Sequence, residues 1–245
     1  MSNYRGANAE NYISMYNMIK KSNIDSSKDV VEFTDEDNVR IRLDLKKGVS
    51  YTCDNEYGQF KKRMTGEESR KRNGYVYTPL NLIIDTGDGD FDFYYKKAEP
   101  CTHAIIAMVK HMEEFESLYS EESMPVANHM NNCPFDNRAE NLEWVTPALN
   151  SIHGKLVHAL ERAMQEGKIP EDVIKYRSNK NKNRTFTTLA EGISCRYIEE
   201  YIGQFIEEGM SYYKVFGAKS SKASIPVDEA LKFWAWYQER KIETC

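Results

Sequence analysis

Hydrophobic and polar residues alternate in short runs along the first hundred residues, a pattern typical of strands that are buried on one face. Residues 8–21 differ, because their apolar side chains recur at helical spacing and predict a helix that packs or binds a partner. The sequence Thr86-Gly87-Asp88-Gly89 predicts a hairpin turn between the last two runs. We therefore expect a small antiparallel sheet in this half. The expected strands are Val30 to Thr34, Val39 to Leu45, Val49 to Cys53, Tyr75 to Ile84 and Phe91 to Tyr95.

One long helix is predicted in the middle of the chain, from His103 to about Tyr119, because its apolar residues fall mostly on one face. After it, residues 126–153 read VANHMNNCPFDNRAENLEWVTPALNSIH. This stretch predicts a strand, a turn-rich loop, a second strand and a helix. The helix opens at Pro147, because proline is favoured in the first turn, and ends before Gly167.

The last third of the chain is expected to hold a linker and a small helical part. Residues 178–183 are Asn-rich and basic with nothing to bury, so a flexible linker is expected there. Residues 187–202 predict a short helix, a turn at Gly192 and a second helix, which resembles a helix-turn-helix; plain helical packing is the alternative. A last helix, 227–241, would cover this part. In the helix-turn-helix interpretation the major groove is faced by Ser194, Cys195, Arg196 and Glu199.

These elements predict an α+β fold with an amino-terminal antiparallel β-rich part and a helical carboxy-terminal part. The expected division has four segments. They are 1–48, a helix and strands without an assigned role; 49–168, a β-rich segment with the strand–loop–strand–helix unit; 169–184, a basic linker; and 185–245, the helical part.

The strand–loop–strand–helix unit gathers residue types that suit phosphodiester hydrolysis. Asn128 and Asn150 offer side-chain oxygens, and Mg²⁺ (or Mn²⁺) prefers oxygen ligands and takes few protein groups beside water and phosphate. His129 would take a proton from an attacking water, a role that suits an imidazole at physiological pH. Asn141 would fix the loop and hold the His129 ring. His153 lies one helical turn beyond Asn150, on the same helical face.

The same stretch resembles the HNH motif of phage- and intron-encoded homing endonucleases, a family of ββα-metal nucleases. That family has an Asp or Asn before the first His, then an Asn heading the phrase NLEW-T, then an Asn or His on the helix. The resemblance implies His129 as general base, Asn128 and Asn150 as metal ligands, and Asn141 as the residue that orients the base. Because some branches of the family use His on the helix, it also implies His153 as a ligand that replaces or assists Asn150. The matching positions, without a gap, are Asn128, His129, Asn141, Leu142, Glu143, Trp144, Thr146 and Asn150.

Two features weigh against the nuclease interpretation. Many members of the family carry Asp where this chain has Asn128, and losing a carboxylate weakens Mg²⁺ binding. Each residue also has a structural interpretation: His129 as a buried histidine, the loop asparagines as turn formers, and Asn150 as a helix cap. The joint occurrence of these residues at the family's spacing favours the functional interpretation.

Composition sets broad limits on the class of protein. The chain has 245 residues, and no apolar run approaches the length that spans a membrane. The amino terminus lacks the basic-then-apolar pattern of a signal peptide. The 5 cysteines include no CxxC pair, so reduced thiols, an intracellular compartment and no structural zinc are expected.

The net charge of −5 argues mildly against a nucleic-acid partner, but its distribution matters more than its sum. Basic residues crowd two stretches that we expect to contact phosphates; the alternative is two solvated faces. The first contains Lys61, Lys62, Arg63, Arg70, Lys71 and Arg72, and the second Lys175, Arg177, Lys180, Lys182 and Arg184.

The sequence therefore predicts an HNH endonuclease of the homing type that cleaves double-stranded DNA with Mg²⁺ or Mn²⁺, phage-borne or carried by another mobile element. Base reading would come from the tail, with Arg196 at the DNA. One motif per chain means that double-strand cleavage needs a homodimer or two successive nicks. Its compartment would be the cytoplasm of a bacterial host. The alternatives are a catalytically weakened HNH-fold protein that binds DNA or protein, and an interaction factor built on an acidic surface.

Overall fold

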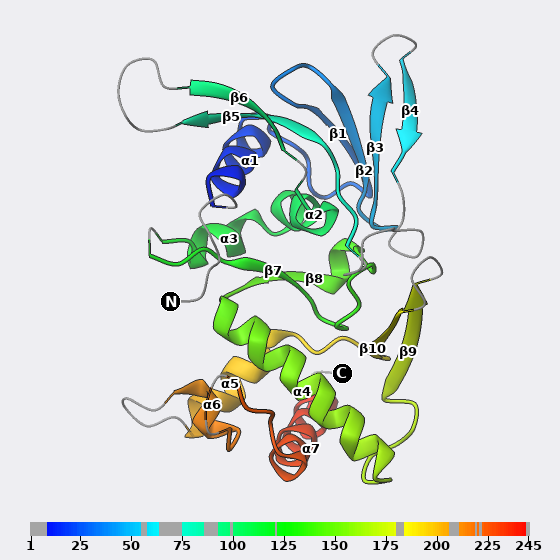
Figure 1. Cartoon of the computed structure of the whole chain (residues 1–245), viewed down its shortest axis with the longest axis vertical. Helices are drawn as coiled ribbons and strands as arrows, with labels where there is room; N and C mark the ends of the chain where they lie inside the picture. The colour runs from blue at the N-terminus through cyan, green and yellow to red at the C-terminus, as the bar shows by residue number, and fades with distance from the viewer. Residues whose placement is uncertain are drawn as a thin grey trace. The chain divides into compact units, whose positions relative to one another are not determined.

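The structure is a computed structural model, and its described residues form a mixed α+β chain that divides into two compact units (Figure 1). The first unit comprises 1–127, 134–144 and 179–183, and the second comprises 128–133, 145–178 and 184–245. The structure describes residues 9–54, 58–63, 75–85, 93–98, 100–120, 122–179, 184–205, 211–218, 220 and 222–243.

An antiparallel four-stranded sheet, with its strands in chain order, is the main β element described in the first unit. Val31, Phe33 and Leu43 are buried, whereas Val30 and Glu32 are exposed, because successive side chains of a strand point to opposite faces. The three strands predicted here are confirmed, and a fourth that was not predicted completes the sheet. The strands are β1 (Val30–Thr34), β2 (Arg40–Asp44), β3 (Val49–Asp54) and β4 (Gln59–Lys62).

A second antiparallel hairpin pairs β5 (Leu80–Asp85) with β6 (Phe93–Ala98). The strand predicted from Tyr75 begins only at Leu80, and Pro79, which has no backbone N–H to donate, stands directly before it. β6 extends beyond its predicted end. The predicted turn at 86–89 lies outside the described residues.

Three described helices of the first unit share its hydrophobic core with these strands. The predicted amino-terminal helix is confirmed as α1 (Ala9–Lys21), and it lies against β5, where the Ser14 hydroxyl donates to the Ile83 carbonyl (Figure 1). The single helix predicted from His103 to Tyr119 is wrong. It is divided at His111 into α2 (Thr102–Lys110) and α3 (Met112–Leu118).

The break has a tertiary cause. His111 has a non-helical backbone (φ −126°, ψ 42°), and its Nε2 lies 3.0 Å from the carbonyl oxygen of Ala139. α2 is buried along nearly its whole length, from Thr102 to Val109, so it is the central helix of this core. Trp144 packs into the same core, edge-on to Phe115 with ring centroids 4.9 Å apart.

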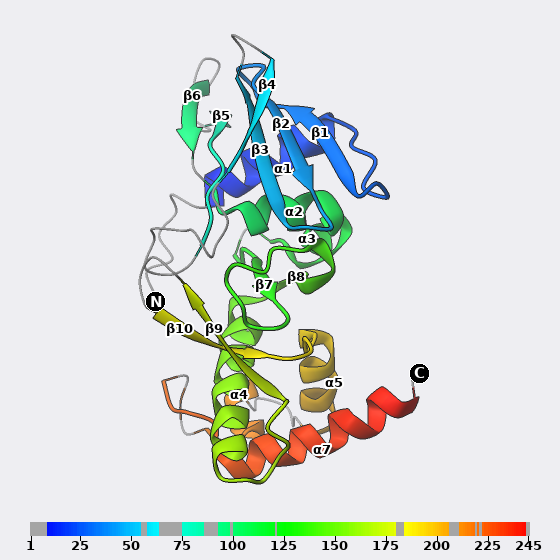
Figure 2. The ribbon, with the colours of Figure 1, turned by 90° about the vertical axis from the view of Figure 1, so that its right-hand side faces the viewer.

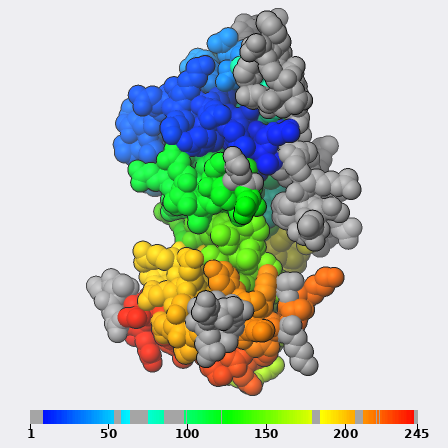
Figure 3. Space-filling view, turned by 90° about the vertical axis from the view of Figure 1, so that its left-hand side faces the viewer, coloured from blue at the N-terminus to red at the C-terminus, as the bar shows by residue number. Residues whose placement is uncertain are grey.

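The second unit is built around the long helix α4 (Pro147–Gln165), which confirms the helix predicted from Pro147. The helix ends before Gly167, whose φ of +70° is the left-handed conformation that glycine tolerates. Figure 3 shows α5 in yellow beside the orange α6 segment on one face of this unit. An aromatic cluster of Tyr201, Phe216 and Phe233 holds these helices together. The helices are α5 (Cys195–Phe205), α6 (Tyr212–Val215) and α7 (Val227–Glu243).

A two-stranded ribbon, β9 (Ile174–Asn179) and β10 (Arg184–Leu189), lies across α4 (Figure 2). The expectation of a linker over 169–184 is therefore wrong for the described part of that segment. Thr185 to Leu189 are mostly β-branched or aromatic residues, and such residues favour a strand over a linker. Residues 180–183 lie outside the described residues.

The same ribbon overturns the helix-turn-helix. Leu189, expected in its first helix, belongs to β10, and only the second helix exists, as α5. Cys195, expected to face a DNA groove, is 1% exposed. The last predicted helix is confirmed as α7, with Phe233 fully buried.

The units also differ from the expected segments. The sheet crosses the predicted boundary at residue 48, because Asp44 of β2 pairs with Val49 of β3. The boundary predicted between residues 184 and 185 cuts through β10. Within the described parts of the chain, no helix combines the length and apolar character needed to cross a bilayer.

Candidate functional site

The strands β7 (Val126–His129) and β8 (Leu142–Val145) form a two-stranded sheet, and α4 follows directly. This confirms the predicted order of strand, loop, strand and helix. The cap of α4 is Thr146, whose hydroxyl accepts from the backbone N–H of Leu149 at 3.3 Å. Asn150 lies inside the first turn, so the interpretation of Asn150 as the helix cap is wrong.

A tight turn follows His129. The backbone N–H of Asn132 donates to the His129 carbonyl at 2.8 Å, and the side chain of Asn131 accepts from the N–H of Cys133 at 2.9 Å. Asn132 has a φ of +57°, a conformation that asparagine adopts more readily than most residues. The asparagines of this turn therefore have local structural roles, as the structural interpretation proposed.

His153 of α4 contacts this turn. Its Nε2 lies 3.1 Å from the Met130 carbonyl oxygen, which also accepts from the N–H of Ile193 at 3.0 Å. A carbonyl only accepts, so Nε2 carries the hydrogen, and Nδ1 of the neutral ring then carries the lone pair. A histidine that binds a metal commonly donates its other N–H to a backbone carbonyl in this way. The contact ties α4 to the residue that follows His129.

Asn128 contacts a different helix. Its Nδ2 donates to the sulfur of Cys195, the first residue of α5, at 3.5 Å. This contact orients the amide so that its nitrogen faces the sulfur and its oxygen points elsewhere. The sequence analysis placed Cys195 at a DNA groove and missed its contact with Asn128, because the two residues lie 67 positions apart in the chain.

Both residues at the end of β7 are largely buried: His129 is 6% exposed and Asn128 is 5% exposed. A general base must reach a water molecule, so access to the His129 ring in this structure is narrow. Its burial agrees with the structural interpretation of a packed histidine.

Asn141 belongs to the first unit, where it ends a short 3₁₀ helix, η1 (Ala139–Asn141). Its amide donates to the Asp136 carbonyl at 2.8 Å, and the Asp136 carboxylate accepts from Arg138 Nε at 2.7 Å. The expected loop-fixing role of Asn141 is therefore confirmed, whereas its role in holding the His129 ring stays a prediction.

The segment that leads into α5 packs closely on the turn. Gly192 lies so near Met130 that an added Cβ would stand 2.8 Å from the Met130 Cβ. Only glycine fits that approach without a shift. The sequence placed a turn at Gly192, but not its contact with the turn after His129.

The predicted metal ligands are mostly oxygen donors, the chemistry that a hard divalent cation prefers, but they are neutral. Among the described residues no group of three His, Cys, Asp or Glu side chains is gathered for a metal. The candidate ligands are instead the amide oxygens of Asn128 and Asn150, with the His153 imidazole on the same helical face as Asn150. Mg²⁺ accepts few protein oxygens when phosphate and water complete its shell, but neutral amides hold it less tightly than carboxylates.

The predicted DNA-contacting cations have mixed positions. Lys61 and Lys62 are exposed on β4, and Arg63 is half-buried. Arg184 at the start of β10 and Arg196 near the start of α5 are exposed. Lys175 and Arg177 of β9 are exposed as well. The remaining predicted contacts lie outside the described residues: Arg70, Lys71, Arg72, Lys180 and Lys182.

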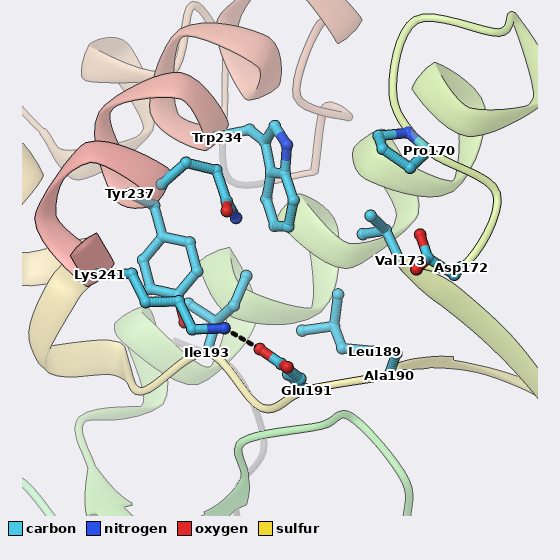
Figure 4. A pocket seen from close by; sticks show the side chains of 11 residues that line it. Pro170, Asp172, Val173, Leu189, Ala190, Glu191, Ile193, Trp234, Tyr237 and Lys241 are labelled. Carbon is cyan, nitrogen blue, oxygen red and sulfur yellow. Dashed lines mark hydrogen bonds and ion pairs between the residues drawn. The ribbon is translucent and has the colours of Figure 1, made fainter. Parts of the chain in front are cut away.

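The second unit also holds a cavity of about 260 Å³ (Figure 4). Trp234 and Tyr237 of α7 form one wall, and the ion pair of Lys241 with Glu191 closes one side. Asp172 adds a second carboxylate to the lining, so the cavity is net negative. That charge disfavours phosphate, and we assign this cavity no part in the chemistry.

No family model, curated protein or solved structure matches the chain.

Proposed function

We propose that the chain is a metal-dependent endonuclease of the HNH type that hydrolyses DNA phosphodiester bonds. The observation that carries the proposal is the contact of His153 with the Met130 carbonyl at 3.1 Å. This contact joins the helix that bears Asn150 to the strand end that bears Asn128 and His129. The sequence motif of that family spans the same elements at the same spacing.

Each residue has a separate task in the proposed reaction. The amide oxygens of Asn128 and Asn150 would hold Mg²⁺ or Mn²⁺, with His153 in support. When bound, the cation would stabilise negative charge on the phosphate and on the leaving oxygen. His129 takes a proton from water, whose oxygen attacks phosphorus in line while the bond from phosphorus to the 3′ oxygen breaks. The leaving oxygen takes up a proton, and the products carry 5′-phosphate and 3′-hydroxyl ends.

The exposed cations would hold the substrate by its phosphates. Lys61 and Lys62 in the first unit and Arg184 and Arg196 in the second are suited to this because they are exposed. Cleavage of both strands would require a homodimer or two successive nicks.

A second candidate is a protein of the same fold that binds DNA or protein without efficient cleavage. The observation that favours it is the 6% exposure of His129 together with an amide at position 128. The burial of His129 restricts the access of water to the base, and the amide at position 128 weakens the binding of the metal. Each would lower the rate of hydrolysis.

A plasmid assay separates the two. The purified chain is incubated with supercoiled plasmid and Mg²⁺ or Mn²⁺, beside His129→Ala and His158→Ala. His158 lies on α4 as well, but its side chain is 58% exposed, so it is a matched control. Nicking by the wild type and the control, lost in His129→Ala, supports the nuclease. DNA binding without nicking by the wild type supports the second candidate.

A further inference from the structure

The register of the β9–β10 ribbon follows from three contacts. The N–H of Ala190 donates to the Val173 carbonyl at 2.9 Å, the Thr188 hydroxyl donates to the Lys175 carbonyl at 2.9 Å, and the Ser178 and Thr185 hydroxyls lie 3.5 Å apart. These pairs step toward each other along the two strands, so the strands run antiparallel. Paired residues share a face, and faces alternate along each strand.

One face of the ribbon packs on α4. From this face the Thr187 hydroxyl donates to Glu161 at 3.0 Å, and the Tyr176 hydroxyl accepts from Gln165 Nε2 at 3.4 Å. Ile174 and Leu189 are buried at the same side. This face therefore has its partner within the unit.

The opposite face is cationic. Alternation places Lys175 and Arg177 of β9 there, with Arg184 and Phe186 of β10. The Arg184 guanidinium lies over the Phe186 ring at 5.0 Å, and all three cations are exposed. Neither strand contains an Asp or Glu, although the whole chain carries a net charge of −5. We call these four residues the cationic face.

The ribbon is anchored to the turn after His129. At the outer edge of β10 the Leu189 N–H donates to the Asn131 carbonyl at 2.9 Å. The Thr187 carbonyl of the same edge accepts from Asn132 Nδ2 at 3.0 Å. On the cationic face, Arg177 Nη1 lies 3.7 Å from the sulfur of Cys133. The position of the ribbon is thus fixed relative to the candidate base.

We propose that the cationic face of the β9–β10 ribbon lies in the major groove of duplex DNA and sets which phosphate reaches His129. The proposal rests on the proposed function, because it takes DNA as the ligand. A two-stranded ribbon fits the width of the major groove, and its three cations can contact the phosphates along the groove. Phe186 would supply an apolar contact to base edges, such as thymine methyl groups.

The test measures binding without cleavage. His129→Ala is used as the background in EDTA, and fluorescence anisotropy gives the Kd for a labelled duplex at several salt concentrations. The ribbon variant is Lys175→Gln with Arg184→Gln. The matched control is Lys214→Gln with Lys222→Gln, which removes two exposed cations of the same unit outside the ribbon. Melting temperatures of all the variants verify that they are folded.

The ribbon variant is expected to bind the duplex more weakly and to reduce the salt slope of log Kd by about 2, since each phosphate contact contributes about 0.9. The control is expected to keep the wild-type slope. An unchanged Kd and slope in the ribbon variant would overturn the proposal. So would equal competition by the single strand of the same sequence.

These outcomes are independent of the plasmid assay. A chain that binds through the ribbon but never nicks plasmid contradicts the nuclease alone. A chain that nicks plasmid while its ribbon variant binds like the wild type contradicts the ribbon alone.

Discussion

Two antiparallel surfaces of this protein combine arginines with a phenylalanine, yet their charges are arranged differently. On the outer face of β1–β4, the guanidinium groups of Arg40 and Arg42 lie over Phe60 at 5.0 and 3.9 Å. Both arginines also pair with Glu32, at 2.8 and 2.7 Å. On the ribbon, Arg184 covers Phe186 in the same manner, but neither ribbon strand carries a carboxylate.

The difference shows why a count of basic residues does not identify a phosphate-binding surface. In the sheet the two arginines share the Glu32 carboxylate of the neighbouring strand, so they join β1 to β2 and part of their charge is compensated. In the ribbon the three cations are exposed, and neither strand supplies a carboxylate. The sequence predicted DNA contacts for Lys61 and Lys62 of β4 and for the ribbon, and we propose the ribbon as the surface that enters the groove.

The largest effect is expected from removing the contact of His153 with the Met130 carbonyl, because it holds the turn on which both the ribbon and the candidate site depend. His153 is 1% exposed, so His153→Ala leaves a cavity and takes one hydrogen bond from the Met130 carbonyl. The free energy of unfolding should fall by roughly 2–4 kcal/mol in urea denaturation. His158→Ala, on the same helix but exposed, should change it by less than about 0.5 kcal/mol. Equal losses in the two variants would show that the contact contributes nothing.

Charge reversal compares the two surfaces directly. Lys175→Glu with Arg184→Glu should weaken duplex binding by roughly a hundredfold at moderate salt, because two contacts become repulsive. Lys61→Glu with Lys62→Glu reverses the same number of charges on β4, and it should weaken duplex binding clearly less. Gel-shift titrations against one duplex measure both. A larger loss from the β4 pair would reverse the comparison.

The contact between Asn128 and Cys195 predicts a smaller change in metal affinity. Cys195→Val removes the acceptor that orients the amide, so Mn²⁺ should bind roughly tenfold more weakly, measured by calorimetry without DNA. In an Asn128→Asp background the same change should have little effect, because a carboxylate has two equivalent oxygens. If both backgrounds lose the same affinity, Cys195 acts on folding rather than on orientation.

The smallest effect is expected at Glu32, which pairs with both arginines of the sheet. The Arg40 guanidinium, with Arg42, holds the pKa of the Glu32 carboxyl below its ordinary value of 4.5. A lowered pKa stabilises the fold above that value, and this stabilisation is lost as the pH falls through the folded-state pKa. Because Glu32 is partly exposed, Glu32→Gln should lower the free energy of unfolding by less than about 1 kcal/mol at neutral pH. In acid, where the carboxyl is protonated, the substitution should leave the free energy of unfolding unchanged.

Glu32→Gln also tests whether the outer face of the sheet approaches DNA as the ribbon is proposed to do. Without Glu32, Arg40 and Arg42 lose their carboxylate, so the salt dependence of DNA binding should become steeper. An unchanged salt slope would mean that the outer face of this sheet does not approach DNA.

The sequence predicted the strands and the helix around the candidate site well because their signals are local. Pro147 and the cap Thr146 determine where α4 starts, and the alternating runs determine β1 to β3. The strand that carries Trp144 is buried as expected, because its side chains belong to the core.

The failures come from contacts between residues far apart in the chain. His111 breaks its helix where its ring meets the Ala139 carbonyl, which no periodicity could reveal. The ribbon was mistaken for a linker because the Asn-rich residues 178–183 outweighed the β-branched run that follows them. That error also created the helix-turn-helix, since it left Leu189 to be read as helical.

In the proposed reaction the His129 ring takes a proton from the water that attacks DNA. The most direct measurement is the nicking rate of supercoiled plasmid by His129→Gly, with and without added imidazole. The account predicts that nicking falls by roughly a hundredfold or more and returns as imidazole is added, because the free base replaces the missing ring. Nicking by His129→Gly at the wild-type rate without imidazole would contradict it.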